Sequence, residues 1–407
     1  MNTSKRDQII NLGAGPSSLP TEVLVQSAQG IVDYAGSGMG LTEISHRSGT
    51  FKKVLETAEA DLRKLLDIPD DYAVFFTQGG GTEQFSATAL NLLAHHAVDN
   101  PTYIQEKGHG PPLDYLVTGS WSNKAIQEAS RLGATTNAVM DVKKSEGKFG
   151  LIPTVDKWKL SDVAERPAML YYCDNETIDG VEFPSPGLPI NSLPQAYRES
   201  VPIVADCSSN ILSRPIDIRA HSIVFFGAQK NVGPPGTTVV ILRKSLVEKH
   251  PDEGVPHGGP RIPTTLVYKN LADNASLYNT PPMFSIHVSG LVFRHLLELG
   301  GVAGAAERSN AKSSLIYSLI DESNGFYVPT VKQLDARSRM NITFRIGGGD
   351  ETLEDGFIKA CKAAGIEQVK GHRSVGGIRT SLYNAITVEQ TERLAAVMKA
   401  FQEQHSS

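Results

Sequence analysis

Apolar positions near the start of the chain follow helical spacing and predict an amphipathic helix over about 51–66. The following segment, 72–77, is short, apolar and aromatic, which is typical of a β-strand. It leads directly into three consecutive glycines at 79–81, and helical spacing of apolar residues returns between 85 and 93. The chain therefore predicts a strand, a glycine turn and a helix in that order.

Further apolar runs lack the alternation of polar and apolar positions that a half-exposed sheet shows, as expected for strands that helices cover on both faces. A helical pattern at about 125–132 separates some of these runs. Together they predict an α/β fold built on a mostly parallel sheet. The runs lie at 115–118, 168–173, 201–205, 222–227 and 237–242.

The pattern changes after 280–282, where Thr-Pro-Pro precedes a long helical stretch that continues to about 299. Further helical segments and two strand-like runs, at 340–346 and 377–382, predict a smaller C-terminal α/β domain. We place the boundary near residue 285. The expected division is an N-terminal segment at 1–15, a large domain at 16–285 and a small domain at 286–407.

The composition is that of an ordinary globular protein of 407 residues with a formal net charge of −5. This mild charge gives no reason to expect nucleic acid or an anionic membrane as a partner. No stretch approaches the roughly 18 apolar residues of a membrane span, and the first residues lack the apolar core of a secretory signal. Because the three cysteines form no CxxC pair, we expect a cytoplasmic location, with neither a disulfide frame nor a metal site.

Three chemically versatile features directly follow predicted strands: the turn at 79–82, Asp206 and Lys230. Each has an ordinary explanation by itself, as a tight turn, a helix N-cap and a lysine that caps a strand end. In an open α/β sheet, however, ligands bind beyond the carboxyl ends of the strands. A lysine that forms imines, an acid that pairs with a pyridine nitrogen and a turn that cradles phosphate together favour a pyridoxal 5'-phosphate site.

Basic residues form a second set, with His46 and Arg47 near the start and His372, Arg373 and Arg379 near the end. Solvated surface charge is the ordinary explanation for either His-Arg dipeptide. Guanidinium and imidazole groups nevertheless suit phosphate and carboxylate ligands. In a chain of net negative charge, we interpret these residues as local anion pockets rather than as a nucleic-acid surface.

Several strings resemble the phosphoserine aminotransferase family, and the resemblance runs nearly from end to end. It implies a fold-type I pyridoxal-phosphate transferase, with a mostly parallel seven-stranded sheet in the large domain. It also implies a homodimer with active sites at the subunit interface. The most specific strings are EISHRS, FFTQGGGTEQF, NETIDG, ADCSSNILSRPIDI, GAQKNVGP, YNTPP and GHRSVGGIR.

The resemblance also implies roles at the cofactor. Lys230 in GAQKN matches the Schiff-base lysine of the family, and Asp206 matches the acid that pairs with the pyridine nitrogen. Trp121 would stack on the cofactor ring, and Thr177 would hydrogen-bond its hydroxyl. The cofactor phosphate would be held by Gly81, Thr82 and Gln229, with Asn279 and Thr280 reaching across from the partner subunit.

The implied reaction is the reversible transfer of an amino group between L-glutamate and 3-phosphohydroxypyruvate, giving O-phospho-L-serine and 2-oxoglutarate, in serine biosynthesis. Arg379 is similar to the residue that holds the α-carboxylate of the substrate. Bacterial members of the family carry Arg where this chain has Thr82 and Ser where it has Ala14, so any side-chain contribution of that Arg is lost. Residues similar to those that hold the substrate phosphate or distal carboxylate are His46, Arg47, His372 and Arg373.

Alternatives of three classes stay open. A small-amino-acid:glyoxylate aminotransferase or a cysteine desulfurase would share the fold, but a substrate without a distal anion does not need the pair of His-Arg dipeptides. A non-catalytic binding module would not need the intact Lys230 and Asp206. A nicotinamide dehydrogenase is disfavoured because the glycine turn lacks the dinucleotide-binding fingerprint and its downstream acid.

Overall fold

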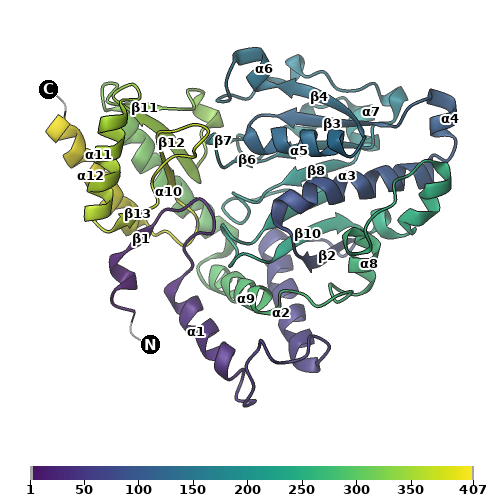
Figure 1. Ribbon diagram of the computed structural model, residues 1–407, viewed down its shortest axis with the longest axis horizontal. Helices are drawn as coiled ribbons and strands as arrows, with labels where there is room; N and C mark the ends of the chain where they lie inside the picture. The colour runs from purple at the N-terminus through teal and green to yellow at the C-terminus, as the bar shows by residue number, and fades with distance from the viewer. Residues whose placement is uncertain (1–2, 406–407) are drawn as a thin grey trace.

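The computed structural model describes residues 3–405 and places two α/β parts side by side (Figure 1). The larger part, at the right of Figure 1, is built on a seven-stranded sheet, and the smaller part, at the left, on a three-stranded sheet. In spatial order, the strands of the large sheet are β2 (Tyr72–Thr77), β10 (Thr238–Arg243), β9 (Ile223–Gly227), β8 (Ile203–Asp206), β5 (Met169–Cys173), β3 (Pro112–Val117) and β4 (Thr135–Asp141).

Strand direction in the large sheet explains why residues far apart in the sequence meet. Strand β10 runs antiparallel to both of its neighbours, and all other pairs in this sheet are parallel. The prediction of an α/β fold with a mostly parallel seven-stranded sheet is therefore confirmed. Because β2, β8 and β9 point the same way, their carboxyl ends share one edge, where the glycine turn, Asp206 and Lys230 follow.

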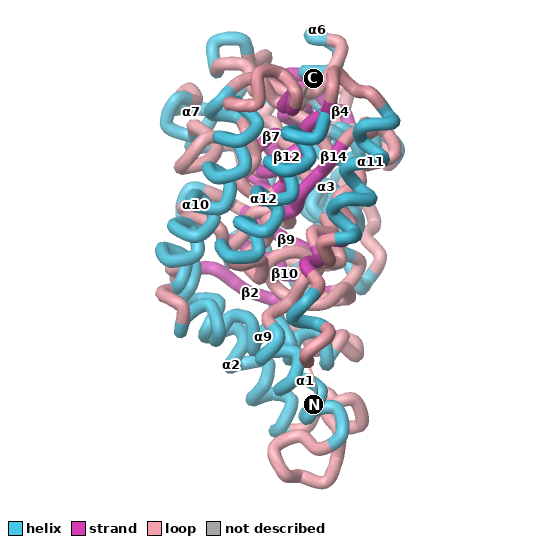
Figure 2. The backbone as a smooth tube through the Cα atoms, turned by 90° about the vertical axis from the view of Figure 1, so that its left-hand side faces the viewer, coloured by secondary structure: helices cyan, strands magenta, loops and turns pink. Residues whose placement is uncertain are grey.

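Helices cover both faces of the large sheet (Figures 1 and 2). Adjacent residues of one strand serve opposite faces, since Phe75 packs into the core beside α3 and α5, whereas Phe76 packs into the core beside α2 and α9. Two buried faces leave no polar side to a strand, which is why alternation is missing from the sequence. The α-helices of the larger part are α1 (Thr21–Val32), α2 (Gly49–Leu66), α3 (Gly80–Asp99), α4 (Tyr103–Lys107), α5 (Ser120–Arg131), α6 (Val142–Glu146), α7 (Gln195–Ser200), α8 (Tyr268–Asp273) and α9 (Met283–Glu298).

The smaller part packs three helices on the sheet β11-β12-β14 around its own apolar core. The N-terminal segment joins this part, because β1 pairs in parallel with β13 through Ile10 and Ile366. Helix α9 instead contributes buried side chains to the core of the large sheet. The domain limits at 15 and 285 stay a prediction. The elements are β1 (Ile10–Asn11), α10 (Gly301–Asp321), β11 (Tyr327–Pro329), β12 (Asn341–Ile346), α11 (Glu351–Ala363), β13 (Ile366–Glu367), β14 (Ile378–Ser381) and α12 (Val388–His405).

One strand of the large sheet, β4, was not predicted from the apolar pattern. It lies at the sheet edge, and most of its side chains are exposed or only half-buried. Its sequence, TTNAVMD, therefore carries too few apolar residues to stand out. An edge strand needs burial on fewer sides than a central one, so its hydrophobic signal is weak.

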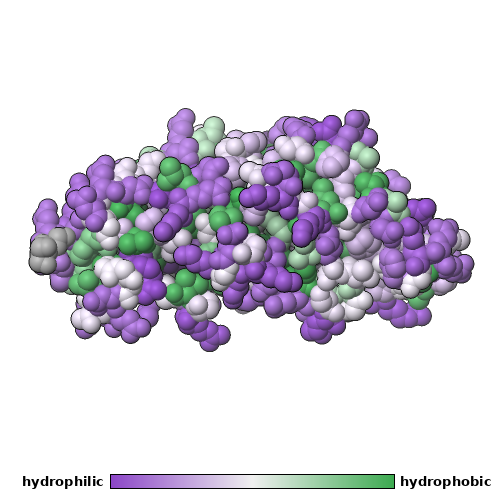
Figure 3. All heavy atoms as spheres, turned by 90° about the horizontal axis from the view of Figure 1, so that it is seen from above, coloured by the Kyte–Doolittle hydropathy of each residue, from purple (hydrophilic) through white to green (hydrophobic). Residues whose placement is uncertain are grey.

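The molecular surface is mostly polar. Figure 3 shows charged and polar side chains over the visible face, with apolar ones scattered in small groups between them. Within residues 3–405, every helix is too short or too polar to cross a lipid bilayer.

Candidate functional site

A cavity of about 240 Å³ opens at the edge of the large sheet where the carboxyl ends of β5, β8 and β9 meet. The N-terminal segment contributes Ala14 and Gly15 to its wall, and the smaller part contributes His372 from the loop before β14 and Arg379 from β14 itself. A larger hollow of about 680 Å³ beside α12 holds none of the predicted site residues. Those that line the cavity are Gly81, Thr82, Trp121, Thr177, Asp206, Gln229, Lys230, His372 and Arg379.

Lys230 lies inside this cavity with only 9% of its surface exposed. Its Nζ donates a hydrogen bond of 2.8 Å to the Thr177 hydroxyl. Burial lowers the pKa of Lys230, although the charge of Asp206 acts in the opposite direction. A lysine in this state has a larger neutral fraction, and the neutral amine is the nucleophile.

The segment at 15–17 lies against Lys230 and hydrogen-bonds the backbone there. The Ser17 hydroxyl donates to the Lys230 carbonyl at 2.7 Å, and the Ser17 N–H donates to the Gln229 carbonyl at 3.1 Å. Gly15 has a φ of +124°, and a Cβ there would lie 3.1 Å from Cγ of Lys230. The segment can therefore approach the lysine this closely only with glycine at this position.

Asp206 is a buried carboxylate at the end of β8. Its Oδ1 accepts the Ser208 N–H at 2.9 Å, and its Oδ2 lies 3.4 Å from the Tyr171 hydroxyl. Burial raises the pKa of Asp206, while these hydrogen bonds and the charge of Lys230 lower it in part. A cationic hydrogen-bond donor placed beside this carboxylate would be strongly favoured.

The glycine turn brings the N-terminus of α3 to the cavity. Gly79 and Gly80 have φ values of +82° and +66°, which suit glycine, and the Gly80 N–H donates to the Thr238 hydroxyl at 2.8 Å. A Cβ at Gly81 would lie 3.2 Å from the Ser208 hydroxyl oxygen, so the backbone here is close to the cavity floor. The first N–H groups of a helix lack helical acceptors, and they favour an anion at this place.

Trp121, at the start of α5, presents its ring to the same cavity. The Nζ of Lys230 lies 5.7 Å from the ring centroid, and the Nζ of Lys124 lies 4.1 Å from it. The indole Nε1 is buried without a hydrogen-bond partner among residues 3–405. A flat aromatic face beside a lysine and a buried acid suits a heteroaromatic ring as ligand.

Positive side chains approach from the smaller part. Arg379 donates from Nη1 to the Thr177 carbonyl at 3.3 Å, and burial lowers its pKa. His372 contacts the Ser374 hydroxyl through Nδ1 at 2.7 Å. Burial, together with the positive charges of Arg379, Lys124 and Arg373, lowers the pKa of His372. An anion bound here would relieve this repulsion between like charges.

Other predicted residues lie outside the cavity of the single chain. Arg47 is exposed in the turn before α2, and its Nε lies 3.3 Å from Nε2 of its neighbour His46. Asn279 and Thr280 are exposed, and the Thr280 carbonyl accepts from Gln78 at 3.2 Å. Arg373 is also exposed and does not line the cavity. Their roles stay predictions.

The structure adds residues that sequence reasoning missed. Asn175 lines the cavity, and its side-chain nitrogen donates to Ser209 at 2.7 Å and to Asn341 at 2.8 Å. Its side-chain oxygen accepts from the Ser338 hydroxyl at 2.6 Å. The strings NETIDG and ADCSSNIL carried the only signal, since no pattern marks a buried asparagine.

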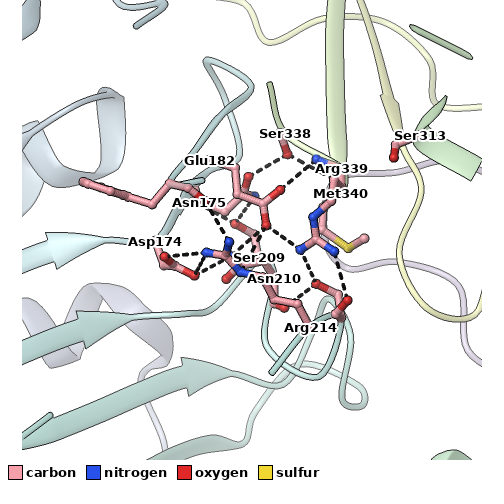
Figure 4. Close-up of polar contacts among 12 residues, drawn as sticks. Asp174, Asn175, Glu182, Ser209, Asn210, Arg214, Ser313, Ser338, Arg339 and Met340 are labelled. Atoms are coloured by element: carbon pink, nitrogen blue, oxygen red, sulfur yellow. Dashed lines mark hydrogen bonds and ion pairs between the residues drawn. The ribbon is translucent and has the colours of Figure 1, made fainter. Parts of the chain in front are cut away.

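A buried ionic network supports the floor of the site (Figure 4). Arg214 contacts both oxygens of Asp174, at 2.6 and 2.8 Å, and its Nε lies 3.8 Å from Glu182. Arg339, from the smaller part, reaches Glu182 at 2.8 Å. Burial alone would raise the pKa of Glu182, but Arg339 and Arg214 together lower it. The network therefore ties the segment around Asn175 to both parts of the molecule.

The chain is similar to known aminotransferases over nearly its whole length. The family model described as aminotransferase class-V matches residues 9–394. The chain is 45% identical over 395 residues to the phosphoserine aminotransferase of Drosophila melanogaster, which covers 97% of this chain and 98% of that protein. A similar solved structure is that of the phosphoserine aminotransferase of Bacillus circulans subsp. alkalophilus, with 38% identity and a TM-score of 0.83; the match covers 98% of this chain and 99% of that one. Another is the PLP-bound phosphoserine aminotransferase of Trichomonas vaginalis, with 35% identity and a TM-score of 0.79; the match covers 96% of this chain and 99% of that one.

Proposed function

The chain belongs to the class-V aminotransferases and, within them, to the phosphoserine aminotransferases, and on this premise we propose its reaction and site. It transfers an amino group between L-glutamate and 3-phosphohydroxypyruvate, giving O-phospho-L-serine and 2-oxoglutarate, in serine biosynthesis. The observation that carries this proposal is the meeting of Lys230, Asp206 and Arg379 around one cavity.

The residues of the cavity fit pyridoxal 5'-phosphate. The indole N–H of Trp121, which has no hydrogen-bond partner among the described residues 3–405, and the buried Asp206 mark a place for a polar heteroaromatic ring. The glycine turn before α3, with Thr82 and Gln229 beside it, offers N–H groups to a phosphate. When bound, this cofactor supplies an aldehyde that accepts the amino group and a ring that withdraws electrons from the substrate α-carbon.

Lys230 would hold the cofactor and handle the proton of the reaction. Its Nζ, partly neutral because of burial, would take the proton from the α-carbon of the amino donor and return one to the α-carbon of the product. Thr177 orients the amine through the 2.8 Å hydrogen bond. Asp206 would keep a proton on the pyridine nitrogen, because a buried carboxylate favours a cationic hydrogen-bond donor beside it.

Arg379 would hold the α-carboxylate of either substrate. Its guanidinium binds carboxylates through two parallel hydrogen bonds, which would fix the α-carbon within reach of Lys230. His372 and Arg373 would take the distal group, which is the phosphate of phosphoserine or the second carboxylate of glutamate. One basic pocket serves both because both groups are anions with planar or tetrahedral oxygen acceptors.

A homodimer would complete the site. Asn279 and Thr280 are exposed and lie outside the cavity of their own chain, as do His46 and Arg47. Apolar side chains are also exposed in the same regions of the sequence, including Val32 at 74% and Met39 at 50%. Contact with a second copy would bury such side chains and bring these polar residues to the partner's cavity. A cytoplasmic location also stays a prediction.

The visible absorption spectrum of the purified protein tests the reaction. We expect a yellow band that fades on addition of O-phospho-L-serine and returns on addition of 2-oxoglutarate. L-Serine at the same concentration is the matched control and should leave the band nearly unchanged. A band that phosphoserine does not change would contradict the substrate proposal, and a protein that takes up no pyridoxal phosphate would contradict the cofactor proposal.

A further inference from the structure

Two buried carboxylates hold the start of the helix that carries Trp121. The Ser120 N–H and hydroxyl donate to the two oxygens of Asp179, at 2.6 and 3.2 Å. The N–H groups of Trp121 and Ser122 donate to the two oxygens of Glu176, at 2.8 and 2.9 Å. Three successive N–H groups at the N-terminus of α5 thus end on side chains from one turn at 174–180.

This capping differs from the usual arrangement, in which the N-cap residue supplies the acceptor. The N-cap of α5 is Gly119, which has no side chain. A Cβ at Gly119 would lie 2.3 Å from Cγ of Glu176, so glycine is required for the acid to come this close. The missing side chain at Gly119 therefore leaves the space that the side chain of Glu176 occupies.

The same turn also contacts the chemical groups of the cavity. Thr177, between the two acids, accepts from Lys230 through its hydroxyl and from Arg379 through its carbonyl. Asn175 anchors the turn to Ser209. Any shift of the turn would consequently move the indole of Trp121 relative to Lys230.

Burying two carboxylates beside each other has an electrostatic cost, which the raised pKa values of both groups show. Glu176 is fully buried, Asp179 is 5% exposed, and burial raises the pKa of both carboxylates, with Asp179 adding to the effect on Glu176. The N-terminal dipole of α5 and the charge of Arg379 offset part of this cost. A neutral cap such as serine would hold a helix at lower cost.

We propose that Glu176 and Asp179 are positioning residues that set the indole plane of Trp121 against the cofactor ring by fixing the first turn of α5. Neither side chain lines the cavity. This inference rests on the proposed function, because it assigns these acids to the cofactor site described above.

The test uses full-length, cofactor-free protein carrying Trp158→Phe, which leaves Trp121 as the single tryptophan. Titration with pyridoxal 5'-phosphate, followed by quenching of Trp121 fluorescence, gives the dissociation constant. We expect Glu176→Gln to raise this constant by about 3- to 30-fold, the range that loss of a helix cap gives. Fluorescence anisotropy of Trp121 should fall, because the indole gains freedom.

Two controls separate positioning from general loss of stability. Asp350→Asn alters the N-cap of α11, where Asp350 accepts from Thr352 and Leu353, and should change neither the dissociation constant nor the anisotropy. In a Trp121→Ala background, with binding measured by equilibrium dialysis, Glu176→Gln should have little further effect because both changes act through one indole.

Two outcomes would overturn the inference. One is that Glu176→Gln leaves both the dissociation constant and the anisotropy unchanged. The other is that Glu176→Gln raises the dissociation constant by the same factor in the Trp121→Ala background. Should Glu176→Gln not fold, Asp179→Asn gives a second test, because it leaves only one of the two carboxylate oxygens that accept from Ser120. If the unsubstituted protein binds no pyridoxal phosphate, the proposed function fails together with this inference. Normal binding with unaffected variants rejects this inference alone.

Discussion

At the residue scale, the environment of Lys230 sets its reactivity. The amine is buried, hydrogen-bonded to Thr177 and attracted by Asp206. Burial favours the neutral amine and Asp206 favours the ammonium form, so the two effects oppose each other. The lowered pKa of Lys230 shows that burial is the larger effect in the cofactor-free chain.

We therefore expect Asp206→Asn to lower the pKa of Lys230 further, because the substitution removes the carboxylate charge that raises it. The rate of acetylation of Lys230 should then begin to rise at lower pH than in the unsubstituted protein. Competitive labelling of cofactor-free protein with acetic anhydride, followed by peptide mass spectrometry across a pH series, measures this. The exposed Lys244 is the internal reference, and its labelling should not change.

A shift of the Lys230 labelling profile toward higher pH would contradict this assignment. It would mean that loss of the Asp206 charge is outweighed by a rearrangement of the cavity. The Thr177→Val variant provides a comparison, because it removes the hydroxyl acceptor of Lys230 without changing any charge.

At the scale of elements, the site depends on connections between segments that no local pattern links. Arg214 joins Asp174 and Glu182, and Arg339 joins Glu182 to the smaller part (Figure 4). Each acid in this network has a basic partner, which makes burial of the charges tolerable. Removing one basic side chain would leave carboxylates buried without compensation.

Arg214→Met should lower the free energy of unfolding by about 3–5 kcal/mol, the usual loss when one partner of a buried ion pair is removed. The matched control is Arg219→Met. Arg219 pairs with Asp67 at 2.7 Å on the exposed surface, where solvent screens the interaction, so we expect no clear change. Urea unfolding followed by circular dichroism measures both variants, and equal effects would show that burial is not the reason for the difference.

At the scale of the whole molecule, one chain does not contain the complete set of predicted residues around its cavity. His46, Arg47, Asn279 and Thr280 lie elsewhere on the surface. In a homodimer with two-fold symmetry, the same residue from each copy can serve the other copy's site. We therefore propose that dimer formation completes each site.

Subunit mixing tests this arrangement. Lys230→Ala and Arg47→Ala homodimers should each be nearly inactive with phosphoserine. If Arg47 acts in the partner's cavity, each mixed dimer contains one intact site, and random mixing should restore about a quarter of the unsubstituted activity. If Arg47 acts in its own chain, every site in the mixed dimer is defective and mixing restores nothing. Light scattering during the exchange confirms that dimers are present.

The amino-acid sequence by itself determined the local elements and the candidate groups. The strand at 72–77, the glycine turn and the helix after it all follow from residue types at short spacing, and the structure confirms them. Central strands were found because burial on both faces demands apolar runs, whereas the exposed edge strand β4 was missed. The position of Lys230 and Asp206 directly after predicted strands marked them as candidates, and family-specific strings then implied their roles.

Only the tertiary structure decided which distant side chains meet. The pairing of Glu176 and Asp179 with the start of α5, and of Arg339 with Glu182, joins residues far apart in sequence. The tertiary structure also showed that Arg47 lies outside the cavity of its own chain. The physical reason is that no local sequence pattern shows whether a carboxylate is buried. Its partners are chosen by the packing of sheets and helices, which is a property of the whole fold.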